Sequence, residues 1–275
     1  MNKYIELTRP LTAIFPFLCC FFVGLVGIIL FNSITLDKLI FASISLALTQ
    51  IFGQITNQIS DPPELDKINN KIRPIVRGEV SKSESWILSV IIFITSIILS
   101  SYVSFEYLVS IILLYVSIYM YNFEPIRLKK RFILNNLILA ISRGFLPFLS
   151  IFYLMYGEIN NIILILSIGI SIWVFIWQTT KDIPDIVGDK KFGIKTIPVV
   201  LGIEKTYIFM TIGSLLFILY SIKISYLFLL FIPLIIYGIK NLEKEYKENT
   251  IGWLVFYIGI LLYYIISILV LLKFF

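Results

Sequence analysis

The sequence predicts an all-α integral membrane protein, a bundle of nine transmembrane helices with two Asp-rich motifs on its cytoplasmic side. Of its 275 residues, 59% are hydrophobic and 15% are charged, whereas soluble domains are about 45–50% apolar and about 25% charged. The apolar residues form long continuous runs without the alternation of a strand, and such runs favour helices. A bilayer is therefore expected to solvate much of this chain.

Each span needs about 20 mainly apolar residues. Nine segments qualify: 11–31, 38–59, 85–103, 106–122, 133–156, 160–180, 205–222, 224–238 and 251–273. The segment 224–238 is short and contains Pro233, so eight crossings is the alternative. We expect one domain over 1–275, built as a pseudo-repeat of 1–132 and 133–250.

The basic residues are distributed unequally between the two sides of this topology. With connections numbered alternately, 19 of the 23 Lys and Arg residues lie on the side of the N-terminus. The positive-inside rule makes that side cytoplasmic. The net charge of +6 then reflects topology and contact with anionic membrane lipids, and a nucleic-acid partner is not expected.

The chain contains no histidine. This excludes histidine acid–base catalysis, histidine-ligated haem and the usual zinc sites. Ionic chemistry must come from carboxylates, Lys, Arg and a metal ion held by oxygen atoms.

A first acidic motif follows the second predicted span. Asn57 and Asp61 are four residues apart, so they share one helix face. Two prolines then interrupt the helix and redirect Glu64 and Asp66. From the sequence, either Glu64 or Asp66 could complete a metal site with Asp61.

A second acidic motif follows the sixth predicted span, on the same side of the membrane. Lys181, Asp185 and Asp189 are spaced at i, i+4 and i+8, which places them on one face of a continuous helix. Asp182 is offset from that face, and Pro184 fits the first turn of a new helix or a kink. The two motifs are thus expected at similar depth.

Carboxylates grouped near lipid repel one another, and a multivalent cation removes that repulsion. Oxygen ligands favour Mg²⁺, which prefers a few carboxylates together with phosphate oxygens. Lys67 and Arg73 flank the first motif and Lys181 begins the second, so the pattern predicts a site for Mg²⁺ and a diphosphate. The alternative is solvated interfacial charge that forms salt bridges within the loops.

Further polar residues lie outside the two motifs. Tyr121, Arg127 and Lys129 follow the fourth span and could bind phosphate, or could form an interfacial anchoring belt. Arg143 lies inside the fifth span, and an ionisable residue there suggests function, with pairing to a carbonyl or carboxylate as the alternative. Asn135 and Asn136 are expected to form interhelical hydrogen bonds.

These passages resemble the UbiA family of intramembrane prenyltransferases. The first motif with Arg73-Pro74 and Gly78, and Lys181-Asp-Ile-Pro-Asp185-Ile-Val-Gly-Asp189, are similar to the two aspartate motifs of that family. Arg9-Pro10, the loop from Tyr121 to Lys129 and the nine-helix topology agree as well. Two departures stand out: the first-motif aspartates are five apart instead of four, and Trp177 replaces a common tyrosine.

The resemblance implies a mechanism and a set of site residues. Two Mg²⁺ ions would bridge a prenyl diphosphate, which would depart to leave an allylic cation for the acceptor to attack. The implied metal ligands are Asn57, Asp61, Asp66, Asp185 and Asp189, with Lys181 also catalytic. The implied diphosphate-binding residues are Arg73, Lys67, Tyr121, Arg127, Lys129 and Arg143.

The form of both motifs looks closer to family members with geranylgeranyl-sized donors than to the hydroxybenzoate enzymes. The resemblance thus implies transfer to a lipophilic or aromatic acceptor, in membrane lipid or quinone biosynthesis. An archaeal-type geranylgeranylglyceryl phosphate geranylgeranyltransferase is the specific alternative. A secondary transporter or a non-catalytic binder of Mg²⁺ and anionic lipid are the alternatives from other classes.

Overall fold

The computed structural model describes residues 2–242 and 250–273, which contain helices and no strand. Eight helical segments are long and apolar enough to cross a membrane: Pro10–Phe31, Leu36–Ser60, Lys82–Val103, Phe105–Asn122, Leu134–Tyr156, Asn161–Asp182, Ile203–Ser221 and Thr250–Leu271. The predicted span 224–238 corresponds to the shorter apolar segment Tyr226–Leu242. The all-helical membrane fold is therefore confirmed, and the count of nine stays a prediction. Two of the basic residues counted between the predicted spans 224–238 and 251–273, Lys244 and Lys247, lie outside the described residues.

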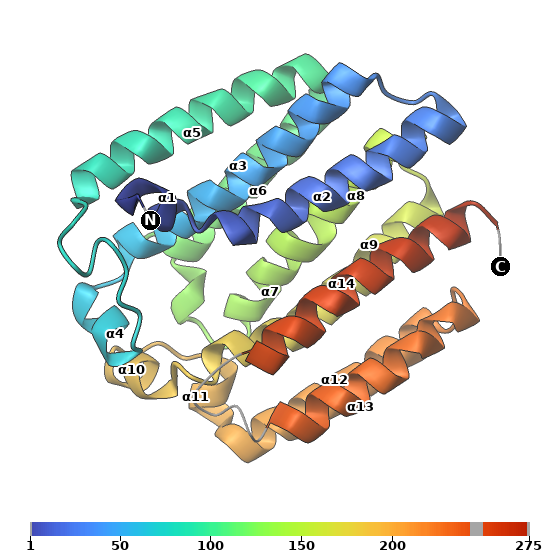
Figure 1. Cartoon of the computed structure of the whole chain (residues 1–275). Helices are drawn as coiled ribbons and strands as arrows, with labels where there is room; N and C mark the ends of the chain where they lie inside the picture. The colour runs from blue at the N-terminus through green and yellow to red at the C-terminus, as the bar shows by residue number, and fades with distance from the viewer. Residues whose placement is uncertain (1, 243–249, 274–275) are drawn as a thin grey trace. The chain divides into compact units, whose positions relative to one another are not determined.

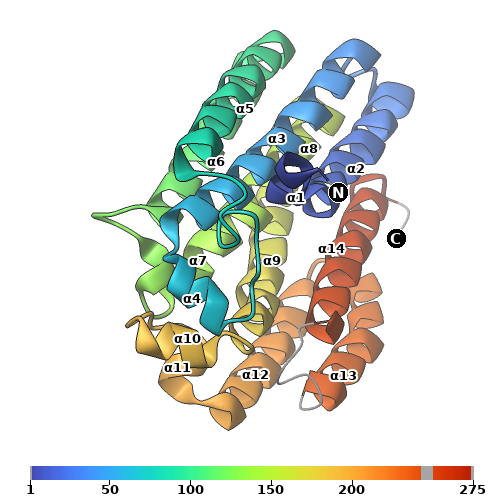
Figure 2. The same cartoon turned by 60° about the vertical axis from the view of Figure 1, so that its left-hand side comes forward.

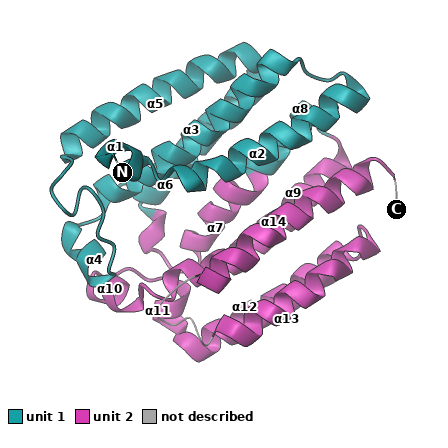
Figure 3. Ribbon diagram, in the orientation of Figure 1, with its two compact units in different colours: residues 1–127, 146–159 teal, residues 128–145, 160–275 magenta. Residues whose placement is uncertain are grey.

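The chain forms two compact units (Figure 3), residues 1–127 with 146–159 and residues 128–145 with 160–275. The fifth span, Leu134–Tyr156, is divided between them. Its first helix, α7 (Leu134–Ala140), belongs to the second unit, and α8 (Leu146–Tyr156) belongs to the first. A π-helical turn over Ile141–Phe145 joins the two helices.

The first unit is built around the long helix α3 (Leu36–Ser60) (Figure 1). Its neighbours are α2 (Pro10–Val26), α5 (Lys82–Val103) and α6 (Phe105–Asn122), and α8 packs on both α2 and α6. Serine side chains define two of the boundaries. Ser81 and Glu84 form a reciprocal capping box at the start of α5, and Ser104 accepts from the Tyr107 amide where α6 begins.

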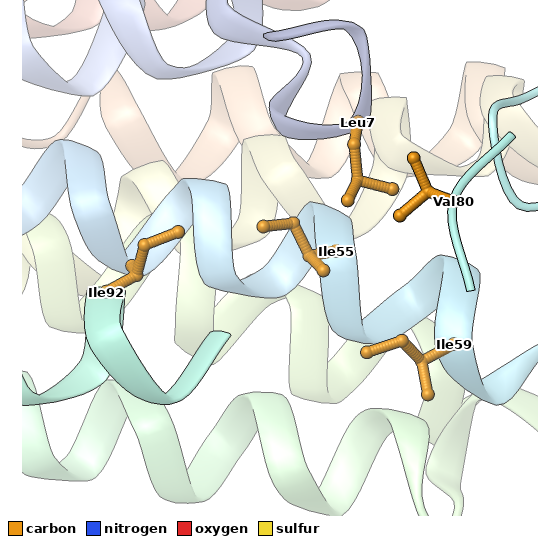
Figure 4. Close-up of a cluster of buried hydrophobic side chains, with 5 residues drawn as sticks. All are labelled: Leu7, Ile55, Ile59, Val80 and Ile92. Atoms are coloured by element: carbon orange, nitrogen blue, oxygen red, sulfur yellow. The ribbon is translucent and has the colours of Figure 1, made fainter. Parts of the chain in front are cut away.

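A short N-terminal helix, α1 (Lys3–Thr8), packs on α3. A buried apolar cluster fixes it there (Figure 4). The cluster consists of Leu7, Ile55, Ile59, Val80 and Ile92. Because Val80 belongs to the connection between α4 and α5, this cluster holds the loop that follows the first acidic motif against α3 and α1.

The second unit is built around α9 (Asn161–Trp177), which packs against α7, α12 (Ile203–Ser221) and α14 (Thr250–Leu271). Helix α13 (Phe231–Leu242) packs against α12 and α14. The Trp173 ring lies directly over Gly259 of α14, and its indole N–H donates to the Phe256 carbonyl at 3.2 Å. A side chain at 259 would occupy the volume of that ring, so glycine permits this close contact between α9 and α14.

Short helices carry the motif regions in both units (Figure 2). Helix α4 (Pro63–Ile68) follows α3 in the first unit. In the second unit α10 (Ile186–Lys191) and α11 (Ile197–Leu201) connect the end of α9 to α12. The acidic residues of each unit are thus placed at the end of a long apolar helix.

Candidate active site

The first motif begins on the last turn of α3. The Asp61 amide still donates to the Asn57 carbonyl at 3.2 Å, but Asp61 and Pro62 have extended backbones. Helix α4 then starts at Pro63, the position where a missing N–H costs nothing. The two prolines therefore turn the chain sharply between Asp61 and Asp66, as the sequence predicts.

The two candidate acids of α4 differ in their surroundings. Asp66 is 3% exposed, and its carboxylate lies 3.3 Å from the Arg73 guanidinium. Glu64 is exposed, and so is Lys67. A buried carboxylate requires a cationic partner or a metal, and Asp66 meets that requirement through Arg73.

Arg127 approaches the first motif from the loop after α6. Its guanidinium donates to the Ser60 carbonyl at 2.9 Å and lies 3.6 Å from the Asp61 carboxylate. Both Asp61 and Asp66 thus have an arginine beside them. Tyr121, in the last turn of α6, is half-buried in the same unit.

Asn122 is a further residue of this site that sequence reasoning missed. It is 2% exposed, its oxygen accepts from the Asn57 side-chain nitrogen at 3.3 Å, and its nitrogen donates to Thr56. Because Asn57 uses its nitrogen here, its carbonyl oxygen is the atom that could ligate a cation. The available signal was an asparagine at the end of an otherwise apolar span.

The second motif is interrupted near Pro184, where the sequence predicts a kink or a new helix. The chain forms a 3₁₀ turn over Gln178–Asp182, turns at Pro184 and begins α10 only at Ile186. Asp185 and Asp189 still lie one helical turn apart, since the Asp189 amide donates to the Asp185 carbonyl at 2.9 Å. Both are buried. Lys181 lies in the 3₁₀ turn, outside the helix of Asp189, because Pro184 does not continue the helical hydrogen bonding of the preceding segment.

Asp182 has a structural environment of its own. One of its oxygens accepts from Lys181 at 2.7 Å and the other from Asn135 at 2.8 Å. The neighbouring Asn136 donates to the Phe175 carbonyl and to Thr179. These bonds tie α7 to the end of α9, so the interhelical role predicted for both asparagines is confirmed.

Lys129 belongs to the second unit, although Arg127 belongs to the first. It is 5% exposed in a 3₁₀ turn over Leu128–Lys130. The Lys195 amide donates to the Lys130 carbonyl at 3.0 Å, which fixes this turn against the segment after α10. The structure thus places a buried ammonium in the same unit as the second motif.

Arg143 lies in the π-helical turn of the fifth span. Its guanidinium donates to the side-chain oxygen of Gln178 at 3.1 Å. Gln178 is 1% exposed. Both residues belong to the second unit.

Each unit offers oxygen donors of the kind that Mg²⁺ prefers, carboxylates and one amide carbonyl. Within either unit, no three Asp, Glu or Cys side chains of the described residues lie close enough to hold a metal by themselves. Mg²⁺ commonly uses only one or two protein carboxylates and takes its other ligands from phosphate and water. The donor sets therefore fit a Mg²⁺–diphosphate.

The family model for the UbiA prenyltransferase family matches residues 13–257. The chain belongs to the UbiA prenyltransferase family. The predicted resemblance is confirmed, and a UbiA-type prenyltransferase, a multi-pass membrane enzyme, is the class established for this chain.

Individual relatives agree with the UbiA assignment. A digeranylgeranylglyceryl phosphate synthase of Methanosphaera stadtmanae is 28% identical over 94% of this chain and 98% of its own length. A probable homogentisate phytyltransferase 2 of Oryza sativa is 28% identical over 54% of this chain and 41% of its own length. The structure of a UbiA homologue from Archaeoglobus fulgidus bound to GPP and Mg²⁺ matches with a TM-score of 0.70, at 20% identity over 97% of this chain and 99% of that one. That likeness establishes the UbiA fold.

Proposed function

We propose that this enzyme catalyses Mg²⁺-dependent transfer of a geranylgeranyl-sized group from a prenyl diphosphate to the hydroxyl of a glyceryl phosphate lipid. Membership of the UbiA family supports the prenyl transfer. The name of the Methanosphaera stadtmanae relative supports the acceptor, because its product carries two geranylgeranyl groups on glyceryl phosphate. The GPP and Mg²⁺ bound to the Archaeoglobus fulgidus homologue support the donor and the metal.

In this proposal both motifs supply ligands for the Mg²⁺ that accompanies the diphosphate. The metal ligands are Asn57, Asp61, Asp66, Asp185 and Asp189. The residues that contact diphosphate oxygens are Arg73, Lys67, Tyr121, Arg127, Lys129 and Lys181. Asp66 is proposed in preference to Glu64 because Asp66 is buried beside Arg73, while Glu64 is exposed.

The chemistry follows from the charges. When bound, Mg²⁺ supplies Lewis-acid stabilisation of the charge on the leaving diphosphate. The C1–O bond of the donor breaks and its electron pair leaves with the diphosphate. The interactions of Arg and Lys side chains with the diphosphate oxygens strengthen as negative charge develops there. The acceptor oxygen then forms a bond to C1, and its proton passes to the departing diphosphate. The apolar helices exclude the water that would otherwise quench the allylic cation.

An aromatic acceptor, as in quinone or tocopherol-type biosynthesis, is the second candidate. The rice relative, a probable homogentisate phytyltransferase, supports it, but that similarity covers only 54% of this chain. The archaeal relative covers nearly the whole of both chains. The observation that carries the main proposal is that both acidic motifs contain buried aspartates, with Arg73 beside the first motif's Asp66 and Lys181 beside the second motif's Asp182.

The proposal is tested with purified protein, Mg²⁺, radiolabelled geranylgeranyl diphosphate and geranylgeranylglyceryl phosphate. We expect Asp61→Asn and Asp185→Asn each to lower kcat by about 100-fold or more, the scale seen when one charge-stabilising group is removed from an active site. Asp37→Asn, at the opposite end of α3 and exposed, should keep activity within about twofold. Full turnover by both Asp61→Asn and Asp185→Asn would contradict the metal assignment.

A further inference from the structure

Arg143 is an arginine inside a membrane span. It lies nine residues into Leu134–Tyr156, about 13 Å along the helix from its start. A charged side chain at that depth is costly and normally has a charged partner or a functional role. A π-helical turn at this position also frequently marks a functional site.

The partner that the structure gives to Arg143 is neutral. Among the described residues, the Gln178 amide oxygen is its hydrogen-bond acceptor, and no carboxylate lies within ion-pair distance. A guanidinium has five N–H donors in a fork that suits carboxylate or phosphate. Most of that donor capacity is therefore unused.

Gln178 provides a second, independent observation. It is 1% exposed, and its side-chain nitrogen has no hydrogen-bond partner within the described part of the chain. A buried amide N–H without an acceptor is unfavourable by about 1–3 kcal/mol. The Gln178 nitrogen therefore lacks an acceptor among these residues, and the neighbouring Arg143 has N–H donors in excess of its one bond to Gln178.

The second motif does not supply that acceptor. Asp182 directs its two oxygens to Lys181 and Asn135. Gln178 precedes Asp182 by four residues of a 3₁₀ turn, which is about 8 Å along the axis, toward the apolar part of the span. The Arg143–Gln178 pair has no carboxylate of its own, so it suits an anion that binds without a metal.

We infer that Arg143 and Gln178 bind the anionic head group of the acceptor, and thereby select acceptors that carry a phosphate. This rests on the proposed function, which supplies a glyceryl phosphate lipid as acceptor. From the sequence, Arg143 is expected on the diphosphate. In the described ranges 2–242 and 250–273, its surroundings contain a neutral amide and no carboxylate that could hold Mg²⁺, and this assigns it to the other substrate. Arg143 contributes two N–H donors to the phosphate, and the Gln178 nitrogen contributes a third.

Steady-state kinetics with each substrate varied separately tests this. We expect Arg143→Gln to raise the KM for geranylgeranylglyceryl phosphate about 10- to 100-fold, the loss expected for charge-assisted hydrogen bonds. The KM for geranylgeranyl diphosphate should stay within about twofold. The acceptor KM of Arg143→Lys should lie between those of the wild type and of Arg143→Gln. Arg131 is an exposed arginine before the same span, and Arg131→Gln should have the KM values of the wild type.

Gln178→Glu gives a second variant in case Arg143→Gln does not fold. The new carboxylate would pair with Arg143, satisfy its charge and occupy the anion's place. We expect this variant to fold and to keep its affinity for geranylgeranyl diphosphate. Its KM for geranylgeranylglyceryl phosphate should rise by a factor similar to that of Arg143→Gln. Size-exclusion profiles and thermal unfolding in detergent verify that each variant is folded.

A binding measurement without donor separates this inference from the proposed function. Purified protein is titrated with geranylgeranylglyceryl phosphate, with geranylgeranylglycerol, which lacks the phosphate, with homogentisate and with phosphatidylglycerol. The inference predicts that the first binds at least about 10-fold more tightly than the second and that Arg143→Gln removes the difference. Arg143-dependent binding without turnover would sustain this inference while the proposed function failed.

Four outcomes overturn the inference. They are a rise in the KM of the donor instead of the acceptor, equal affinity for the lipids with and without phosphate, preference for homogentisate, and equally tight binding of phosphatidylglycerol. Equally tight binding of phosphatidylglycerol would show that Arg143 binds membrane phospholipids in general.

Discussion

At the scale of single residues, α4 shows how the structure separates two acids that the sequence leaves equivalent. The extra proline sets the start of α4 at Pro63, so Asp66 falls in its first turn beside the buried Leu65. Glu64 falls on the exposed side. Burial makes the unpaired carboxylate unfavourable, and Arg73 offsets that cost.

This difference gives a matched prediction. Asp66→Asn should reduce kcat by about 100-fold, because a buried metal ligand and its charge are lost. Glu64→Gln, two residues away on the same helix, should keep activity within about twofold. Initial rates at saturating Mg²⁺ measure kcat for both variants. A larger loss of kcat in Glu64→Gln than in Asp66→Asn would assign the metal to Glu64.

At the scale of elements, hydrogen bonds and ion pairs join α1 to the loop between α4 and α5, which carries Arg73. Arg77 donates to Glu6 of α1 at 2.7–2.8 Å and to Glu79 at 2.7–2.8 Å. Lys3 donates to the Glu79 carbonyl at 2.9 Å. The hydrogen bonds from Arg77 lower the pKa of Glu6 and of Glu79 below the usual 4.5.

A pH dependence follows from these shifts. A carboxylate whose pKa is lowered in the folded state contributes stability above its unfolded pKa and loses it as pH falls through its folded pKa. We expect the wild-type midpoint of thermal unfolding to fall between pH 6 and pH 3, and proteolysis before α3 to accelerate. Glu6→Gln should reduce that dependence.

The control for this effect is Glu204→Gln, which removes an exposed carboxylate from α12. It should leave the pH dependence of the first unit unchanged. The ion pairs of Arg77 with Glu6 and Glu79 are half-exposed, so about 0.5 M salt should weaken them. Identical acid profiles for the wild type and Glu6→Gln would show that α1 is held by its apolar contacts alone.

At the scale of the whole molecule, charge predicts orientation. In the predicted nine-span topology, most Lys and Arg residues lie on the side of the N-terminus and of both acidic motifs. The short connections on the other side carry few basic residues, Lys223 among them. We propose that the N-terminus and both motifs face the cytoplasm.

Cysteine labelling in intact cells measures this orientation. In a variant with Cys19 and Cys20 replaced by alanine, Lys223→Cys should react with a membrane-impermeant maleimide without permeabilisation. Lys190→Cys should react only after permeabilisation. Both lysines are exposed, so accessibility within the protein does not bias the comparison, and the reverse pattern would invert the topology.

Much of this protein is readable in its sequence because hydrophobic run length and loop charge are local properties. Asp61, Asp185 and Asp189 are recognisable in the same way, since the motifs that contain them are contiguous. Asn122 was not found, because its contact with Asn57 joins residues 65 positions apart. The spacing of Lys181 and Asp185 left a kink or a new helix at Pro184 open, and the structure has a new helix that begins at Ile186.

By itself the sequence determined the membrane environment, the helical class and the two acidic motifs, because each depends on composition and spacing along the chain. Only the tertiary structure decided that Asp66 is buried while Glu64 is exposed, that Asp182 is already bonded to Lys181 and Asn135, and that Arg143 contacts Gln178. The physical reason is that burial and hydrogen-bond partners belong to the packed chain. Whether a charged group is satisfied depends on residues that lie far from it in sequence.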